Sequence, residues 1–144
     1  MRVAILQDYL EKIKSLGRYK GKAPYKPCLL LAVIELIERG TLYENRIVLS
    51  DDLKEAFGKY VWLTSWDRKN IHDPFFYLKS DGFWHLYPNG VRNARQASYA
   101  RLDYRLFILL TAFEHREIIR QEIINAYFRS SDRKSKTWLK LHEA

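Results

Sequence analysis

The chain has 144 residues, with 25 Lys and Arg against 17 Asp and Glu, a formal net charge of +8 and one cysteine. This length suits a single domain that buries a core without a disulfide, and one cysteine excludes both an internal disulfide and a cysteine-based zinc site. Residues 1–16 lack the pattern of a secretory signal, and no run approaches the ~18 apolar residues of a membrane span, so we expect a cytoplasmic protein without a membrane partner.

The positive charge is segregated along the chain, which favours a polyanionic partner. No acidic residue lies between Lys12 and Ile34, and the cations of that stretch are Lys12, Lys14, Arg18, Lys20, Lys22 and Lys26. Residues 91–105 contain only Asp103 as an acid, against Arg92, Arg95, Arg101 and Arg105. A third group comprises Arg129, Arg133, Lys134, Lys136 and Lys140.

The first half of the chain predicts three helices and a short strand. Apolar residues recur at helical spacing over 3–16, with Gly17 as a C-cap. Residues 27–40 are apolar on nearly every face, which predicts a central helix that begins at Pro27. Residues 46–49 read as a strand, and Ser50 is expected to cap a helix over 50–63.

The second half predicts a hairpin followed by helices. Residues 75–78 and 83–86 are aromatic-rich runs around KSDG, in which Gly82 can take a positive φ. From about residue 94 to 128 the pattern is helical, and residues 130–144 form a polar C-terminal segment. We therefore expect one mainly helical α+β domain with a small antiparallel β-hairpin over 75–87, packed against the central helix.

The sequence gives little support for catalysis. The histidines, at 72, 85, 115 and 142, lack metal-ligand spacing. A restriction-type Asp-x-Lys pair occurs three times, as chance predicts in a basic chain, at Asp52–Lys54, Asp67–Lys69 and Asp132–Lys134. We expect a binding module with no catalytic residue, metal or cofactor, and a small metal-dependent nuclease using one of these pairs stays open as an alternative.

The basic loop 17–26 leads into the N-terminus of the most apolar helix. Free backbone N–H groups and the positive end of the helix dipole favour a phosphate where these cations gather. Pro24 and Pro27 bracket Tyr25 and Lys26 and hold them in a stiff presentation. We interpret the loop as a phosphate-binding element, the alternative being a solvated lysine-rich loop.

Four segments together resemble a known family. They are KAPYKPCLLLAVIELIERG, RIVLSDDLKEAFGKYVWL, DPFFYLKSDGFWHL and HREIIRQEIINAYF, in this order. Their combination resembles the sulfur-binding domain that precedes the HNH nuclease domain in phosphorothioate-dependent type IV restriction enzymes, and the match covers most of residues 20–129. The resemblance implies a domain that recognises DNA whose backbone carries a non-bridging sulfur in place of a phosphate oxygen.

The resemblance also implies a sulfur pocket. Carried over from the family, it consists of Asp73 and Pro74 with Tyr77 nearby, and of Tyr25 and Lys26 opposite. Asp73 departs from the family pattern, because a carboxylate repels a phosphorothioate. We expect that Asp73 pairs with a cation or caps a helix, or that His72 takes the neighbouring role.

The remaining DNA contacts are expected from cations at phosphates or bases, namely Arg18, Lys20, Lys22, Arg92, Arg95 and Arg101. The predicted function is recognition of phosphorothioate-modified double-stranded DNA as the targeting module of a restriction system, with a nuclease as a possible partner. The other interpretation is a sulfur-independent domain of winged-helix type. In that case the hairpin is the wing, and residues 92–101 form the helix that enters the major groove.

Overall fold

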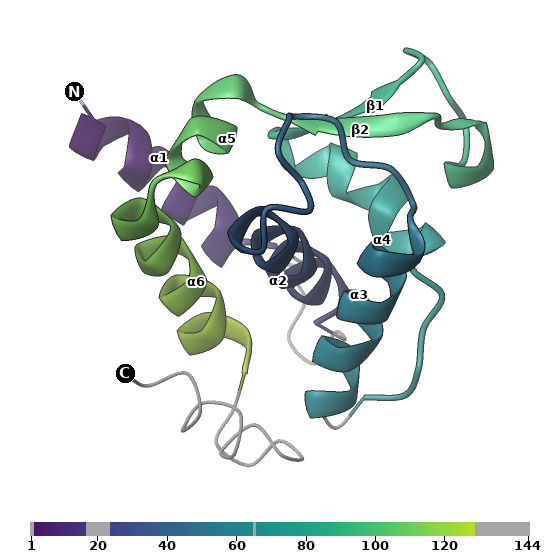
Figure 1. Ribbon diagram of the computed structural model, residues 1–144, viewed down its shortest axis with the longest axis horizontal. Helices are drawn as coiled ribbons and strands as arrows, with labels where there is room; N and C mark the ends of the chain where they lie inside the picture. Colours follow the sequence, from purple (N-terminus) through teal and green to yellow (C-terminus); the bar gives the residue numbers. More distant parts are fainter. Residues whose placement is uncertain (1, 17–23, 65, 129–144) are drawn as a thin grey trace.

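The computed structural model describes residues 2–16, 24–64 and 66–128, and it confirms a mainly helical α+β domain with one antiparallel two-stranded sheet (Figure 1). The first elements are α1 (Arg2–Lys14), α2 (Tyr25–Glu38), α3 (Asp51–Leu63), α4 (His72–Tyr77) and the 3-10 turn η1 (Leu78–Asp81). They are followed by β1 (Trp84–Tyr87), the 3-10 turn η2 (Ala94–Gln96), β2 (Tyr99–Leu102), α5 (Tyr104–Thr111) and α6 (Phe113–Tyr127). None of these helices is long and apolar enough to cross a membrane.

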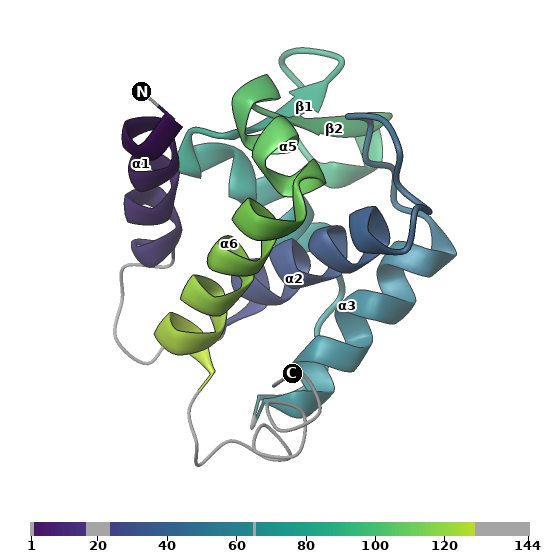
Figure 2. The same cartoon turned by 60° about the vertical axis from the view of Figure 1, so that its left-hand side comes forward.

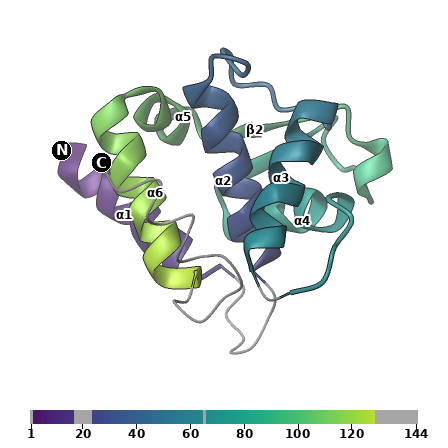
Figure 3. The same cartoon turned by 60° about the horizontal axis from the view of Figure 1, so that its bottom comes forward.

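Helix α2 is the centre of the molecule, as its composition predicts. Every residue from Pro27 to Ile34 is buried, and α3, α4, α5 and α6 all pack against the helix. Figures 2 and 3 show α2 between α6 on one side and α3 on the other. The helix begins at Tyr25, with Pro24 as its N-cap residue, so its first turn contains both Tyr25 and Lys26. The predicted start at Pro27 was two residues late.

Helix α3 begins where its capping residue predicts. The Ser50 hydroxyl accepts a hydrogen bond from the Leu53 N–H at 3.1 Å, and Asp51 and Asp52 occupy the first turn. Both features stabilise a helix N-terminus, because they satisfy a free donor and complement the helix dipole. The structure therefore confirms the helix predicted after Ser50.

The strand predicted over 75–78 was wrong, because these residues form α4 and the start of η1. Phe75 and Leu78, three positions apart, are buried, whereas Tyr77 is exposed, which is helical rather than alternating spacing. A short aromatic run does not distinguish the two periods by itself. The Trp84 indole N–H donates to the Phe75 carbonyl at 2.9 Å, and so ties α4 to the sheet.

The hairpin exists, and β1 confirms the strand predicted over 83–86 with a shift of one residue, but its partner is β2 rather than 75–78. Trp84 pairs with Leu102 and Tyr87 with Tyr99, so residues 99–102 supply the second strand. The helix predicted from residue 94 to 128 was therefore wrong over 97–102 and reduced to the 3-10 turn η2 over 94–96, and the recognition helix over 92–101 was wrong as well. The observed helices α5 and α6 cover the rest of that range and are separated at Ala112, which has extended backbone angles.

The predicted strand over 46–49 forms only one bridge. Ile47 and Ala100 exchange two backbone hydrogen bonds of 2.8 Å, so this segment lies beside β2 without extending the sheet further. Gly82 has φ of +90°, as predicted for the turn that leads into β1. The predictions for Gly17 and for residues 130–144 fall outside the described residues.

Candidate nucleic-acid interface

The first turn of α2 lies against the loop that precedes α4. The Tyr25 hydroxyl donates a hydrogen bond of 2.8 Å to the carbonyl of Asp67, 42 positions away in the chain. Burial raises the pKa of Tyr25, and nearby Lys69 lowers it by a smaller amount. The phenol therefore keeps its proton at neutral pH and acts as the donor of this bond.

Lys69 connects the two predicted halves of the sulfur pocket. Its Nζ lies 5.6 Å from the centre of the Tyr25 ring and 3.1 Å from Oδ2 of Asp73. The expectation that Asp73 pairs with a cation is thus confirmed, which reduces its repulsion of an anion. We use the name α2–α4 junction for the group comprising Tyr25, Lys69, His72, Asp73, Pro74 and Tyr77.

The short helix α4 presents the rest of the junction. Pro74 is buried in its first turn, and Tyr77, three residues further on, is 57% exposed. Residues three apart on a helix lie on neighbouring positions of one face. The Tyr77 ring contacts the Phe76 ring edge to face, with 5.1 Å between ring centres, which holds the exposed ring against α4.

Lys26 lies apart from this group, in an ion pair. Its Nζ donates to Oδ2 of Asp81 at 2.7 Å, and both side chains are largely covered from solvent. The pair attaches the first turn of α2 to the turn η1. The charge of Lys26 is therefore balanced by Asp81, so it adds little positive potential for a bound anion.

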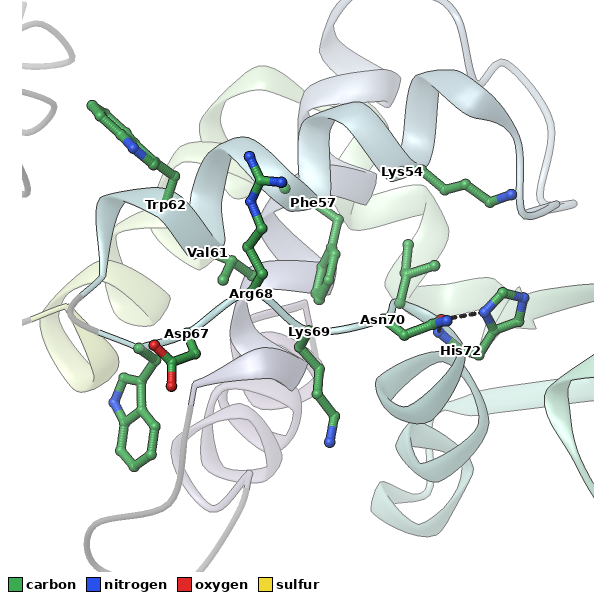
Figure 4. A pocket seen from close by; sticks show the side chains of 12 residues that line it. Lys54, Phe57, Val61, Trp62, Asp67, Arg68, Lys69, Asn70 and His72 are labelled. Carbon is green, nitrogen blue, oxygen red and sulfur yellow. Dashed lines mark hydrogen bonds between the residues drawn. The ribbon is translucent and has the colours of Figure 1, made fainter.

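A cavity of about 730 Å³ adjoins the junction, between α3 and residues 66–72. Figure 4 shows Lys54 and Trp62 on α3, with Arg68 and His72 on the opposite wall. Trp62 and Trp66, both lining the cavity, are 46% and 43% exposed, which is unusual for the largest apolar side chain. A cavity lined by both cations and exposed indole rings suits a ligand with both negative charge and flat apolar groups.

His72 borders both the cavity and the junction. Its backbone N–H donates to Oδ1 of Asn70 at 2.7 Å, and its ring Nδ1 contacts the same oxygen, so Asn70 fixes the start of α4 (Figure 4). The other ring nitrogen is not used in this contact. His72 is half-buried at the edge of the junction, beside the cavity.

The predicted DNA-binding arginines lie on two different surfaces. Arg92 and Arg95 are exposed around the turn η2, which packs against α4. Arg101 is on β2, where it pairs across the sheet with His85. Arg18, Lys20 and Lys22 lie outside the described residues. The sequence-based prediction missed Lys69, Arg68 and the two tryptophans, although the four-residue spacing of Lys69 and Asp73 is a signal for their ion pair.

The Asp-x-Lys pairs lie on elements unlike the strand expected of a restriction-type nuclease. Asp52 and Lys54 are in the first turns of α3, and Asp67 and Lys69 are in the loop before α4, while the third pair is outside the described residues. Within residues 2–16, 24–64 and 66–128, no group of three or more His, Cys, Asp or Glu side chains is placed to hold a metal ion.

Neither a scan against protein-family models nor a search of curated proteins gave a match to this chain.

Proposed function

We propose that this protein recognises double-stranded DNA carrying a phosphorothioate, and that the sulfur binds at the α2–α4 junction. The observation that carries the proposal is the position of Lys69, which contacts both the Tyr25 ring and Asp73. Two segments that the family resemblance assigns to one pocket, and that lie more than 40 positions apart in the chain, thus meet in space. Their meeting supports a single binding site.

The side chains of the junction suit sulfur better than oxygen. Sulfur is larger, more polarizable and less strongly hydrated, so it costs less to move against the Tyr77 ring and the first turn of α4. An oxygen in the same place loses its water without a replacement partner, at a cost of roughly 1–3 kcal/mol. Discrimination then comes partly from the rejection of an ordinary phosphate.

The charge around the junction supports a phosphate ligand. Lys69 lies within the junction, and Arg95 is on the turn that packs against α4. Lys54 and Arg68 line the adjoining cavity. Arg95, Lys54 and Arg68 are available to the remaining oxygens of the modified phosphate and to its neighbours on the same strand, whereas Lys69 is shared with Asp73. The exposed tryptophans of the cavity provide apolar surface for the sugar or base next to it.

The same proposal assigns a targeting role. The protein is a binding module of a restriction system, and cleavage belongs to a nuclease that acts as its partner. No residue of the junction is assigned a catalytic step. Sulfur-independent binding of duplex DNA is the competing function, and the hairpin of β1 and β2 is compatible with it.

The test is a fluorescence-polarisation titration with two duplexes of the same sequence, one carrying a single Rp phosphorothioate, in several sequence contexts. We expect the modified duplex to bind at least about tenfold more tightly in a suitable context, about 1.4 kcal/mol. The ratio persists as salt is raised, because both duplexes carry the same charge. Equal binding in all contexts, with affinities that fall together with salt, contradicts the proposal and leaves general DNA binding.

A further inference from the structure

The outward side of the two-stranded sheet carries a group of arginine and tyrosine side chains that are not part of the proposed sulfur site. Side chains alternate along both strands, so Trp84 and Leu86 are buried while His85 and Tyr87 face outward. On β2, Tyr99 and Arg101 face outward opposite them. We use the name outer sheet face for Arg46, His85, Tyr87, Tyr99 and Arg101.

Two arginines are held on this face by a pair of tyrosines. The Tyr87 and Tyr99 rings are stacked, with centres 5.2 Å apart and planes 10° from parallel. The Arg46 guanidinium lies 4.8 Å from the centre of the Tyr99 ring. That of Arg101 lies 5.1 Å from the Tyr87 ring and 5.4 Å from the Tyr99 ring. Guanidinium groups held over aromatic rings are pre-organised and keep their N–H edges available.

Among the described residues, Arg46 and Arg101 have no carboxylate partner, whereas the nearby carboxylate of Asp103 is bound by other side chains. Neither Arg46 nor Arg101 forms an ion pair in that part of the chain. Asp103, by contrast, binds the His85 ring through one oxygen and accepts the Tyr9 hydroxyl at 2.9 Å through the other. A hollow of about 600 Å³ beside the strands is lined by both arginines and also by Glu44 and Asp103. Two fixed cations therefore border an open surface.

The outer sheet face is turned away from the α2–α4 junction. Trp84 packs edge to face on Phe75 of α4, with 5.4 Å between ring centres, so α4 covers the inward side of the sheet (Figure 1). Side chains that alternate with Trp84 project to the other side. A ligand of Arg46 and Arg101 is thus separate from a ligand of Tyr77.

The geometry points to a second nucleic-acid surface, on which Arg46 and Arg101 bind unmodified phosphodiester groups of duplex DNA without regard to sulfur or sequence. Both guanidinium groups lie within 5.4 Å of the centre of the same Tyr99 ring, so they are close enough to each other to reach neighbouring phosphates of one strand. Because the rings already stack on each other and on the arginines, phosphates suit this face better than unpaired bases. The inference does not rest on sulfur recognition at the junction.

The experiment compares the full chain with the double variant R46Q/R101Q, using an unmodified duplex over a range of salt concentrations. The matched control is K14Q/K59Q, which removes the same charge from ion-paired lysines on α1 and α3. We expect R46Q/R101Q to weaken binding about tenfold at low salt relative to this control. We also expect its salt slope to be smaller by about 0.9 for each phosphate that the variant no longer neutralises. Melting temperatures confirm that both variants are folded.

Two results overturn the inference. One is an R46Q/R101Q affinity and salt slope equal to those of K14Q/K59Q. The other is tighter binding of a single strand than of the duplex, abolished by Tyr99→Ala, which assigns the face to base stacking. The preference for the Rp phosphorothioate is measured in parallel. It stays unchanged in R46Q/R101Q, so a failure at this face and a failure at the junction are distinguishable.

Discussion

Lys69 is the side chain on which the candidate site depends most. Its two contacts, with the Tyr25 ring and with Asp73, join the start of α2 to the start of α4. An exposed ion pair of this kind contributes at most about 1 kcal/mol to stability. The ion pair between Lys69 and Asp73 affects the candidate site more than it affects the fold, because it places a carboxylate beside the cation at the position where we expect an anion to bind.

Replacing the acid tests this arrangement. Asp73→Asn removes a negative charge from the junction and releases Lys69, while the exposed position leaves the fold intact. We expect tighter binding of both modified and unmodified duplex, by a few-fold at low salt, with the ratio between them nearly unchanged. Polarisation titrations of both duplexes measure this. Weaker binding of either duplex shows that Asp73 itself contacts the DNA favourably, contrary to the expected repulsion.

Tyr77 tests the apolar part of the junction. Tyr77→Ala removes the exposed ring beside the first turn of α4, and we expect the preference for the phosphorothioate duplex to fall about tenfold, about 1.4 kcal/mol. Binding of the unmodified duplex changes less, because the ring carries no charge. The control is Tyr43→Ala, which removes a tyrosine that is 82% exposed and outside the junction. If the two variants retain the same preference, Tyr77 does not contact the sulfur.

Among the elements, the pair α2 and α3 is joined by the carboxylate of Glu35. It accepts a hydrogen bond from the Tyr60 hydroxyl at 2.7 Å and also pairs with Lys59, both on α3. Burial favours the neutral form of Glu35, but the hydrogen bonds from Lys59 and Tyr60 outweigh it and lower its pKa below the ordinary value of 4.5. The charged carboxylate is thus the form that holds the two helices together.

This link predicts a dependence of stability on pH. Because the folded-state pKa of Glu35 is depressed, its contribution is full above about pH 4.5 and is lost as the pH falls through the lower folded value. At neutral pH we expect Glu35→Gln to lower the free energy of unfolding by about 1–3 kcal/mol. The difference from the wild type should shrink in acid. Denaturant unfolding at several pH values measures it, with the exposed Glu11→Gln as control. A difference that is constant with pH excludes this role for the carboxylate.

How far the elements are predictable depends on their length and surroundings. Helix α2 was predicted from a long apolar run, and helix α3 from its capping residue Ser50. Both signals lie within the helix or next to it, so they can be recognised in the local sequence. Residues 75–78 and 99–102 were assigned to the wrong class. Their conformation depends on Trp84, which binds α4 through Phe75 on one side and pairs with Leu102 on the other. Such contacts between distant segments override local preference in short elements.

The arrangement of the candidate site was predictable only in part. The resemblance brought Tyr25, Asp73 and Tyr77 into one hypothesis, and the structure places Tyr25 and Asp73 around the same lysine. It also separates Arg101, on β2, from Arg95, on the turn that packs against α4, which no spacing in the sequence indicates. Distances in space between charged residues depend on how the sheet pairs, and that pairing is not encoded in any single segment.

At the scale of the whole molecule, a net charge of +8 makes the attraction of DNA general, so affinity alone is weak evidence for a particular site. Cations occur in the junction, in the adjoining cavity and on the outer sheet face. Any duplex is therefore expected to bind at low salt. The proposed specificity depends on the single sulfur atom of the phosphorothioate, so the DNA duplexes that are compared must carry the same charge.

The Rp and Sp diastereomers of a single phosphorothioate provide that test, because they have the same sequence, composition and charge. The measurement is the affinity of the protein for each, as pure duplexes at moderate salt. The proposed site at the α2–α4 junction meets the phosphate group from one side, so we expect Rp to bind at least about tenfold more tightly than Sp, about 1.4 kcal/mol. Equal affinity for the two diastereomers contradicts sulfur recognition at the junction.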